Sequence, residues 1–121
     1  MLIVDDSILI SKKLKTMLSS LNYVTIVGHA KNSAEAFAML SIALPDVIIL
    51  DIQMPGKNGI EFLTDIRLRH LDTKVIIFTN QPDPYYRNLC KQLGADYFLD
   101  KSKEFEKIPH ILEYYCTQLF K

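Results

Sequence analysis

Five side chains that could act together on a phosphate or a metal ion stand at the ends of short apolar runs. They are Asp5, Asp6, Asp51, Thr79 and Lys101. Asp51 follows four apolar residues, three of them β-branched, and a proline and a glycine come within five residues of it. A continuous apolar run is typical of a strand buried on both faces of a parallel sheet. The carboxyl ends of such strands share one edge, where open α/β sheets place their ligands.

Each of these residues also has an ordinary structural interpretation. Asp51 could form a turn with its side chain on the loop backbone, and Asp5 and Asp6 could simply end a strand. Thr79 could be a β-branched strand residue, and Lys101 could be a solvated charge. All of these ordinary interpretations would have to hold at once, and at one edge of the sheet. The opposite ends of the same apolar runs carry no equivalent set of side chains. The sequence therefore favours a joint site.

The chemistry of such a site follows from its charge. Two carboxylates about 4 Å apart repel by roughly 4 kcal/mol at an effective dielectric near 20. Three acids in one cleft need a cation or a raised pKa, and an all-oxygen site with few protein ligands suits Mg²⁺. The Asp51 carboxylate could then attack a phosphoryl group. Lys101 would neutralise charge on the phosphoryl oxygens, and the Thr79 hydroxyl could donate to one of them.

Alternating sequence patterns predict five strands and five helices. Strands are expected at residues 1–4, 23–28, 47–50, 74–79 and 96–99. Helices are expected between Ser7 and Asn22, between Asn32 and Pro45, from Gly59, from Asp83 to Gly94, and from near Ile108. Alternation with short connections predicts a three-layer (βα)5 domain of the α/β class, with helices on both faces of a parallel sheet.

Composition narrows the function classes. The chain has 121 residues, enough for one domain, with 14 basic and 14 acidic residues and a formal net charge of zero. This balance argues against a nucleic-acid binder held by bulk charge. Lys12, Lys13 and Lys15 are interpreted as a solvated helix face. No apolar run reaches the ~18 residues that span a membrane, and two aspartates end the first run too early for a signal peptide. A cytoplasmic location is expected.

Cysteines and histidines give no metal-binding pattern. Cys90 and Cys116 lie far apart in helix-like apolar patterns, which favours two reduced core thiols, although a disulfide stays open. The three histidines show no spacing of metal ligands; they are His29, His70 and His110.

The chain resembles the receiver domain of two-component response regulators, of the chemotaxis-regulator type, over essentially its whole length. The matching motifs are Asp5-Asp6, Asp51-x-x-Met54-Pro55-x-x-x-Gly59, Thr79 and Phe98-x-x-Lys101. This resemblance implies that residues 1–121 form one receiver domain with a flavodoxin-like fold. It also implies a five-stranded sheet of order 2-1-3-4-5.

The resemblance also implies roles for the site residues. Asp51 would accept a phosphoryl group from a histidine kinase or a phosphotransfer protein, assisted by Thr79 and Lys101. The implied Mg²⁺ ligands are Asp6, Asp51 and the main-chain carbonyl of Gln53, with Asp5 acting through water. Thr79 and Phe98 would couple the site to a surface formed by the fourth helix, fifth strand and fifth helix. That surface would meet an effector domain, a target protein or a second copy, and no direct contact with nucleic acid or membrane is expected.

Three positions depart from the family pattern. Ser102 stands where many members have proline, so a cis peptide bond is not expected there. Asn80 follows Thr79 where a small residue is usual, which narrows access to Asp51. Phe98 lacks a phenolic hydroxyl, and plain core packing remains an alternative for it.

Two other functions compete with a phosphorylated switch. A phosphohydrolase of the haloacid dehalogenase type needs a second aspartate two residues after the nucleophile, where this chain has Gln53. A flavodoxin-like cofactor binder needs a phosphate-cradling loop after the first strand, where Asp5 and Asp6 would repel phosphate. The chain is therefore expected to be a phosphoacceptor and not an enzyme. It is expected to be either a stand-alone receiver or a part of a longer regulator. Because the sequence starts directly on the first strand, we favour a chain cut from a longer regulator.

Overall fold

Strands and helices alternate strictly along the chain in the computed structural model, which describes residues 1–53, 58–69, 72–80 and 82–119. The strands are β1 (Leu2–Val4), β2 (Gly28–Ala30), β3 (Val47–Leu50), β4 (Lys74–Thr79) and β5 (Tyr97–Asp100). The helices are α1 (Ile8–Leu18), α2 (Ser33–Ile42), α3 (Gly59–Leu68), α4 (Pro84–Gln92) and α5 (Lys107–Leu119).

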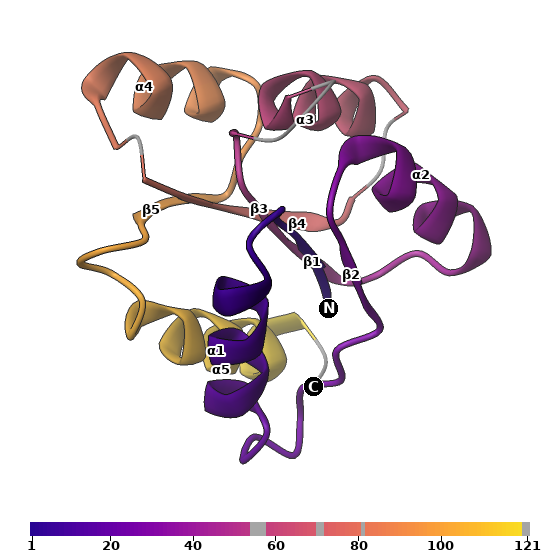
Figure 1. The fold of residues 1–121 in the computed structure, drawn as a ribbon, viewed down its shortest axis with the longest axis vertical. Coiled ribbons are helices and arrows are strands. Elements are labelled where there is room, and N and C mark those ends of the chain that lie inside the picture. Colours follow the sequence, from indigo (N-terminus) through magenta and orange to yellow (C-terminus); the bar gives the residue numbers. More distant parts are fainter. Residues whose placement is uncertain (54–57, 70–71, 81, 120–121) are drawn as a thin grey trace.

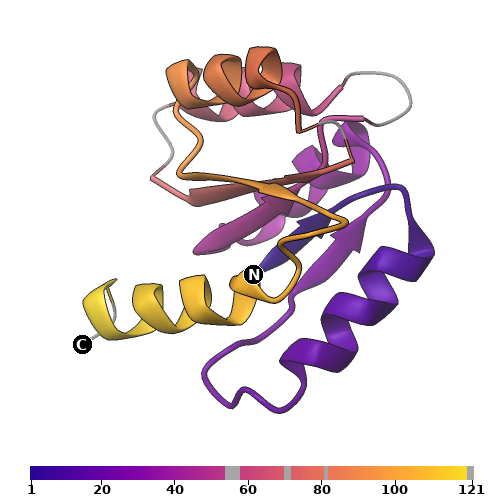
Figure 2. The same cartoon turned by 90° about the vertical axis from the view of Figure 1, so that its left-hand side faces the viewer.

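All strand pairs are parallel, and the sheet order is β2-β1-β3-β4-β5. Helices α2, α3 and α4 cover one face of the sheet, while α1 and α5 cover the other (Figures 1 and 2). The predicted three-layer architecture and strand order 2-1-3-4-5 are confirmed. The order reverses between β1 and β3, which is where this class of fold binds its ligands.

Two apolar cores lie on the two faces of the sheet. In β3, Ile48 and Leu50 belong to the core beneath α2 and α3, whereas Val47 and Ile49 belong to the core beneath α1 and α5. All four side chains are buried, so both faces of this strand lie in apolar surroundings. This double burial explains why the strand has a continuous apolar run without an alternating pattern.

The predicted second strand was wrong in position: residues 23–28 were expected, and β2 spans Gly28–Ala30. The β-branched composition suggested the earlier stretch, but a strand also needs a partner. Val24 N–H instead bonds the Leu21 carbonyl in a turn, and Val27 is 57% exposed. Residues before β2 contact the first strand only through Met1, whose N-terminal nitrogen donates to the Thr25 carbonyl at 2.7 Å and whose carbonyl accepts from the Val27 N–H at 2.9 Å.

Helix starts were predicted more accurately than helix ends. Four N-cap side chains accept from the main chain three residues later; they are Ser7, Asn32, Asn58 and Asp83. The Asn58 cap was missed. Helix α1 ends at Leu18 and not near Asn22, because the chain turns there, with Leu21 N–H on the Leu18 carbonyl. Helix α2 ends at Ile42 and not at Pro45, and Leu44, which lies in the stretch predicted to be helical, is 55% exposed.

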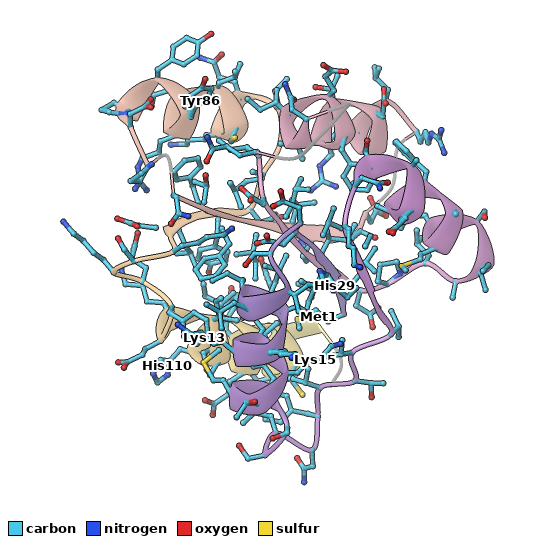
Figure 3. All side chains as sticks on the ribbon, viewed as in Figure 1. Met1, Lys13, Lys15, His29, Tyr86 and His110 are labelled. Carbon is cyan, nitrogen blue, oxygen red and sulfur yellow. The ribbon has the colours of Figure 1, made fainter. Side chains whose placement is uncertain are left out.

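The remaining sequence features agree with their predicted settings. Cys90 is a buried core thiol as predicted, whereas Cys116 is only half-buried; both are free, which excludes the disulfide. Burial raises the pKa of the Cys90 thiol to about 11. Lys12, Lys13 and Lys15 are exposed on α1, two of them labelled in Figure 3. In the described parts of the chain, no helix has the length and apolar character needed to cross a membrane.

Gly59 lets the first turn of α3 lie directly against the end of β3. A Cβ atom at this position would stand 2.2 Å from the Asp51 carbonyl oxygen and 2.7 Å from the Ile52 Cα. The Gly59 N–H donates to the Ile52 carbonyl at 3.2 Å. A side chain would have to displace the main chain that carries Asp51, so this glycine positions the candidate site.

We therefore expect Gly59→Ala to lower the free energy of unfolding by about 2 kcal/mol, although alanine normally favours a helix. Urea denaturation measures the change. Gly28→Ala is the control. Its Cβ would meet the flexible Met39 side chain at 3.0 Å, so this substitution should lower the free energy of unfolding by less. Equal stability of Gly59→Ala and the parent would contradict this explanation.

Candidate functional site

Hydrogen bonds of the sheet extend to the candidate residues at its carboxyl edge. Asp5 N–H donates to the Ala30 carbonyl, Asp51 N–H to the Val4 carbonyl and Lys101 N–H to the Thr79 carbonyl, each at 2.9 Å. These bonds continue the β1–β2, β1–β3 and β4–β5 pairings by one step. The main chain of each candidate residue is thus fixed by the sheet before its side chain makes any contact.

Three carboxyl groups meet at this edge. Asp5, Asp6 and Asp51 each have a carboxylate oxygen within 4.8 Å of the others. Asp5 is 1% and Asp51 4% exposed, whereas Asp6 is exposed to solvent. Asp5 Oδ1 accepts from the Ser7 N–H at 2.8 Å, and Asp51 Oδ1 accepts from the Gln53 N–H at 3.0 Å. The main chain therefore orients both buried carboxylates.

Lys101 joins the two buried carboxylates. Its Nζ lies 2.7 Å from Asp5 Oδ2 and 3.0 Å from Asp51 Oδ2, and its side chain is 5% exposed. Burial alone would lower the pKa of Lys101, but the hydrogen bond to Asp5 and the charges of both carboxylates outweigh it and raise the pKa. The ammonium is therefore charged, and three carboxylates with one ammonium leave a formal charge of −2.

Burial raises the pKa of Asp51 above its ordinary value. The Gln53 N–H and the Lys101 ammonium act in the opposite direction, and the neighbouring Asp5 charge adds to the increase. Desolvation therefore outweighs the ion pair. A carboxylate in this setting is less well stabilised than one in water, which favours a bond or contact that removes its charge.

The two candidate switch residues lie on neighbouring strands. Thr79 is fully buried at the end of β4, opposite Asp100 of β5. Phe98 is half-buried, two residues earlier on β5, and pairs with Ile77. The motif residues Met54 and Pro55 lie outside the described residues.

A hydrogen-bonded loop holds Lys101 after β5. Asp100 Oδ1 accepts from both the N–H and the hydroxyl of Ser102, and these bonds lower the pKa of Asp100. The Asp100 N–H donates to Glu104 Oε1 at 3.0 Å, and Lys107 donates to Glu104 Oε2. The expected trans geometry at Ser102 agrees with the structure, whose described residues contain no cis peptide bond.

Sequence reasoning missed a histidine beside the site. His29 Nε2 donates to the Asp5 carbonyl at 2.6 Å, where the main-chain pairing between β1 and β2 stops (Figure 3). Its contact depends on the register of β2, which the sequence did not predict correctly. The structure pairs His29 with Ile3, two residues before Asp5, and no local sequence pattern indicates that register.

Comparison with known proteins assigns the family. The profile of the response regulator receiver domain matches residues 1–113. The chain belongs to this family. Its fold and motifs are those of a receiver domain of two-component signalling, as the sequence predicted.

Individual relatives agree with this assignment. The chain is 37% identical over 108 residues to a protein-glutamate methylesterase/protein-glutamine glutaminase of Clostridium acetobutylicum, covering 87% of this chain and 31% of that protein. The response regulator domain of Thermotoga maritima CheB is 33% identical, with a TM-score of 0.80, over 93% of this chain and 90% of that one. A DNA-binding response regulator of the LuxR family from Staphylococcus aureus is 28% identical, with a TM-score of 0.84, over 93% and 95%.

The chain spans between 25% and 52% of the length of eight curated relatives that it matches. Those proteins differ in their names, from methylesterase to transcriptional regulator. What they share with this chain is the receiver domain.

The raised pKa of Asp51 predicts the sign of a stability change. Ionisation of a group with a raised folded-state pKa destabilises the fold above that pKa, and the cost vanishes below the unfolded value near 3.9. We expect Asp51→Asn to be more stable than the parent at pH 7 in metal-free buffer, with the difference shrinking towards pH 4. Urea denaturation at both pH values measures it.

Asp100→Asn is the matched control for this measurement. Hydrogen bonds from Ser102 lower the pKa of Asp100, so its carboxylate contributes stability above the unfolded pKa that is lost as the pH falls. Asp100→Asn should therefore be less stable than the parent at pH 7. A loss of stability in Asp51→Asn at pH 7 would contradict the assigned burial cost.

Proposed function

We propose that residues 1–121 act as one receiver domain in which Asp51 accepts a phosphoryl group from a histidine kinase or a phosphotransfer protein. The observation that carries the proposal is the position of Lys101 between Asp5 and Asp51, with Asp6 beside them. Asp51 combines burial, a raised pKa and a place at the central strand end. Its carboxylate is desolvated, which favours reaction with an electrophile over hydration.

The donor set fits a divalent cation. The formal charge of −2 at the edge equals the charge that Mg²⁺ neutralises, and carboxylate oxygens are its preferred ligands. We propose Asp6, Asp51 and the Gln53 carbonyl as direct ligands and Asp5 as a ligand through water. Bound Mg²⁺ would neutralise negative charge on the phosphoryl oxygens.

The chain's own residues supply the rest of the transfer. An Asp51 carboxylate oxygen attacks phosphorus while the bond from phosphorus to the donor's histidine nitrogen breaks, and the electron pair stays on that nitrogen. Lys101 leaves Asp51 and pairs with a phosphoryl oxygen, which keeps the buried ammonium neutralised. The Thr79 hydroxyl donates to another phosphoryl oxygen. The product is an aspartyl phosphate.

The competing functions lack their required groups. Gln53 stands where a phosphohydrolase of the haloacid dehalogenase type has its second acid, and an amide is a poor acid or base. The buried Asp5 at the end of β1 disfavours a phosphate-cradling loop of the flavodoxin kind. We therefore propose a phosphoacceptor that assists only its own phosphorylation and dephosphorylation, acting in the cytoplasm, where a donor charged from ATP works.

The proposed output surface is a groove between α4, β5 and α5, with a volume of about 770 Å³. It contains charged residues of α4, the half-buried Phe98 and the exposed aromatic side chains of Tyr97 and Tyr114. We propose that an effector domain, a target protein or a second copy meets the domain here, and that the domain itself contacts neither nucleic acid nor membrane.

Phosphorylation by a small donor tests the assignment of Asp51. With Mg²⁺ and acetyl phosphate, the parent and the control Asp46→Asn, at the opposite edge of the sheet, should acquire a label that alkali and hydroxylamine release, as expected of an acyl phosphate. Asp51→Asn should remain unlabelled, because an amide is not a nucleophile towards phosphorus. Undiminished labelling of Asp51→Asn would refute the assignment.

Metal titration tests the proposed ligands separately. We expect Asp6→Ala to weaken Mg²⁺ binding by at least about tenfold, because an ion with few protein ligands loses one directly. Asp5→Ala should weaken it less, and Asp46→Ala, at the opposite edge before β3, should not. Calorimetry measures the affinities. Identical affinities for Asp6→Ala and the parent would exclude this metal site.

A further inference from the structure

Arg87 on α4 holds one residue of β5 at two points. Its guanidinium carbon lies 4.8 Å from the centre of the Phe98 ring, and its Nη1 donates to the Phe98 carbonyl at 3.2 Å. A cation at this distance from a ring face is attracted by the ring's quadrupole, and the planar guanidinium can also stack on it. The helix is thereby fastened to both the main chain and the side chain of Phe98.

Phe98 has apolar neighbours on one side and the groove on the other. Like Tyr86 and Leu93, it packs against the core that includes Cys90 of α4, and it also lines the groove between α4, β5 and α5. Figure 1 shows α4 and β5 side by side at the edge of the sheet. In this structure the ring therefore occupies a groove-facing position beneath an exposed cation.

We infer that Arg87 is a positioning residue that stabilises the groove-facing orientation of the Phe98 ring and so opposes switching. The inference rests on the proposed function, in which Phe98 turns inward once Asp51 carries a phosphoryl group. Inward rotation removes the ring from the guanidinium, while the bond to the Phe98 carbonyl can persist. Ring position and phosphorylation are then linked. A contact that stabilises the groove-facing ring therefore disfavours the phosphorylated state, in which the ring turns inward.

Lys91 provides a matched comparison on the same helix. It lies one turn after Arg87, is also exposed, carries the same charge and lines the same groove. Among the described residues, the cation placed over the Phe98 ring is Arg87. Removing Lys91 therefore changes the charge of the groove without removing the contact to the ring.

The experiment compares Arg87→Ala, Arg87→Lys and Lys91→Ala in two measurements. The first is the Phe98 ring position in the unliganded protein, followed by NMR with ¹³C-labelled phenylalanine. The second is the affinity for beryllofluoride, a phosphoryl mimic, in the presence of Mg²⁺. Arg87→Ala should move the Phe98 resonances towards their beryllofluoride-bound positions and tighten beryllofluoride binding about two- to fivefold.

Arg87→Lys should give an intermediate shift and affinity, because an ammonium keeps the charge but loses the planar stacking. Lys91→Ala should match the parent in both measurements. A purely structural role of Arg87 would loosen α4 and weaken beryllofluoride binding, so the sign of the change separates the two roles.

Two results would overturn the inference. One is an Arg87→Ala protein whose Phe98 resonances and beryllofluoride affinity equal those of Lys91→Ala. The other is weaker beryllofluoride binding by Arg87→Ala. Failure of the proposed function has a different signature, namely a parent protein that does not bind beryllofluoride at Asp51 although Arg87→Ala still moves the Phe98 ring.

Discussion

One buried ammonium shared between two buried carboxylates determines how this site behaves. Lys101 bonds Asp5 and Asp51 together, yet burial still leaves the pKa of Asp51 raised. With Asp6 at the edge, the site retains a formal charge of −2. The folded chain therefore has an electrostatic free-energy cost that a bound divalent cation would reduce, and in the proposed reaction Asp51 would exchange its ion pair for a covalent bond. The buried charges thus lower the stability of the fold at the place where the proposed reaction requires a reactive carboxylate.

The sheet makes this arrangement possible because it fixes main-chain positions independently of the charges. The bonds from Asp5, Asp51 and Lys101 to neighbouring strands continue the regular pairing, so repulsion between side chains cannot easily separate them. Gly59 adds a second restraint, since α3 lies too close to the Asp51 carbonyl for any side chain. The Phe98 ring, in contrast, is held by weaker contacts to Arg87, as befits the part that is proposed to move.

Sequence reasoning succeeded where a local pattern determines the structure. The apolar runs before Asp51 and Thr79 are buried on both faces, as in a parallel sheet. Because the carboxyl ends of parallel strands share an edge, the proximity of the acidic side chains to Lys101 was predictable. The position of β2 was not predictable in the same way, because residues 24–27 are β-branched but bond only Met1 of the first strand, and the regular register with β1 begins at Gly28. The contacts of His29 and Arg87 were also missed, since they depend on strand register and on side-chain direction across two elements.

In the proposed mechanism, Asp51 becomes the covalent phosphoryl carrier when Lys101 exchanges a carboxylate for a phosphoryl oxygen. A crystal structure with Mg²⁺ and beryllofluoride tests it most directly. We expect beryllium bonded to an Asp51 carboxylate oxygen, the metal ion held by Asp6 and Asp51, and Lys101 Nζ within hydrogen-bond distance of a fluoride. Beryllofluoride bound to another residue, or Lys101 still bridging Asp5 and Asp51 with beryllofluoride present, would contradict it.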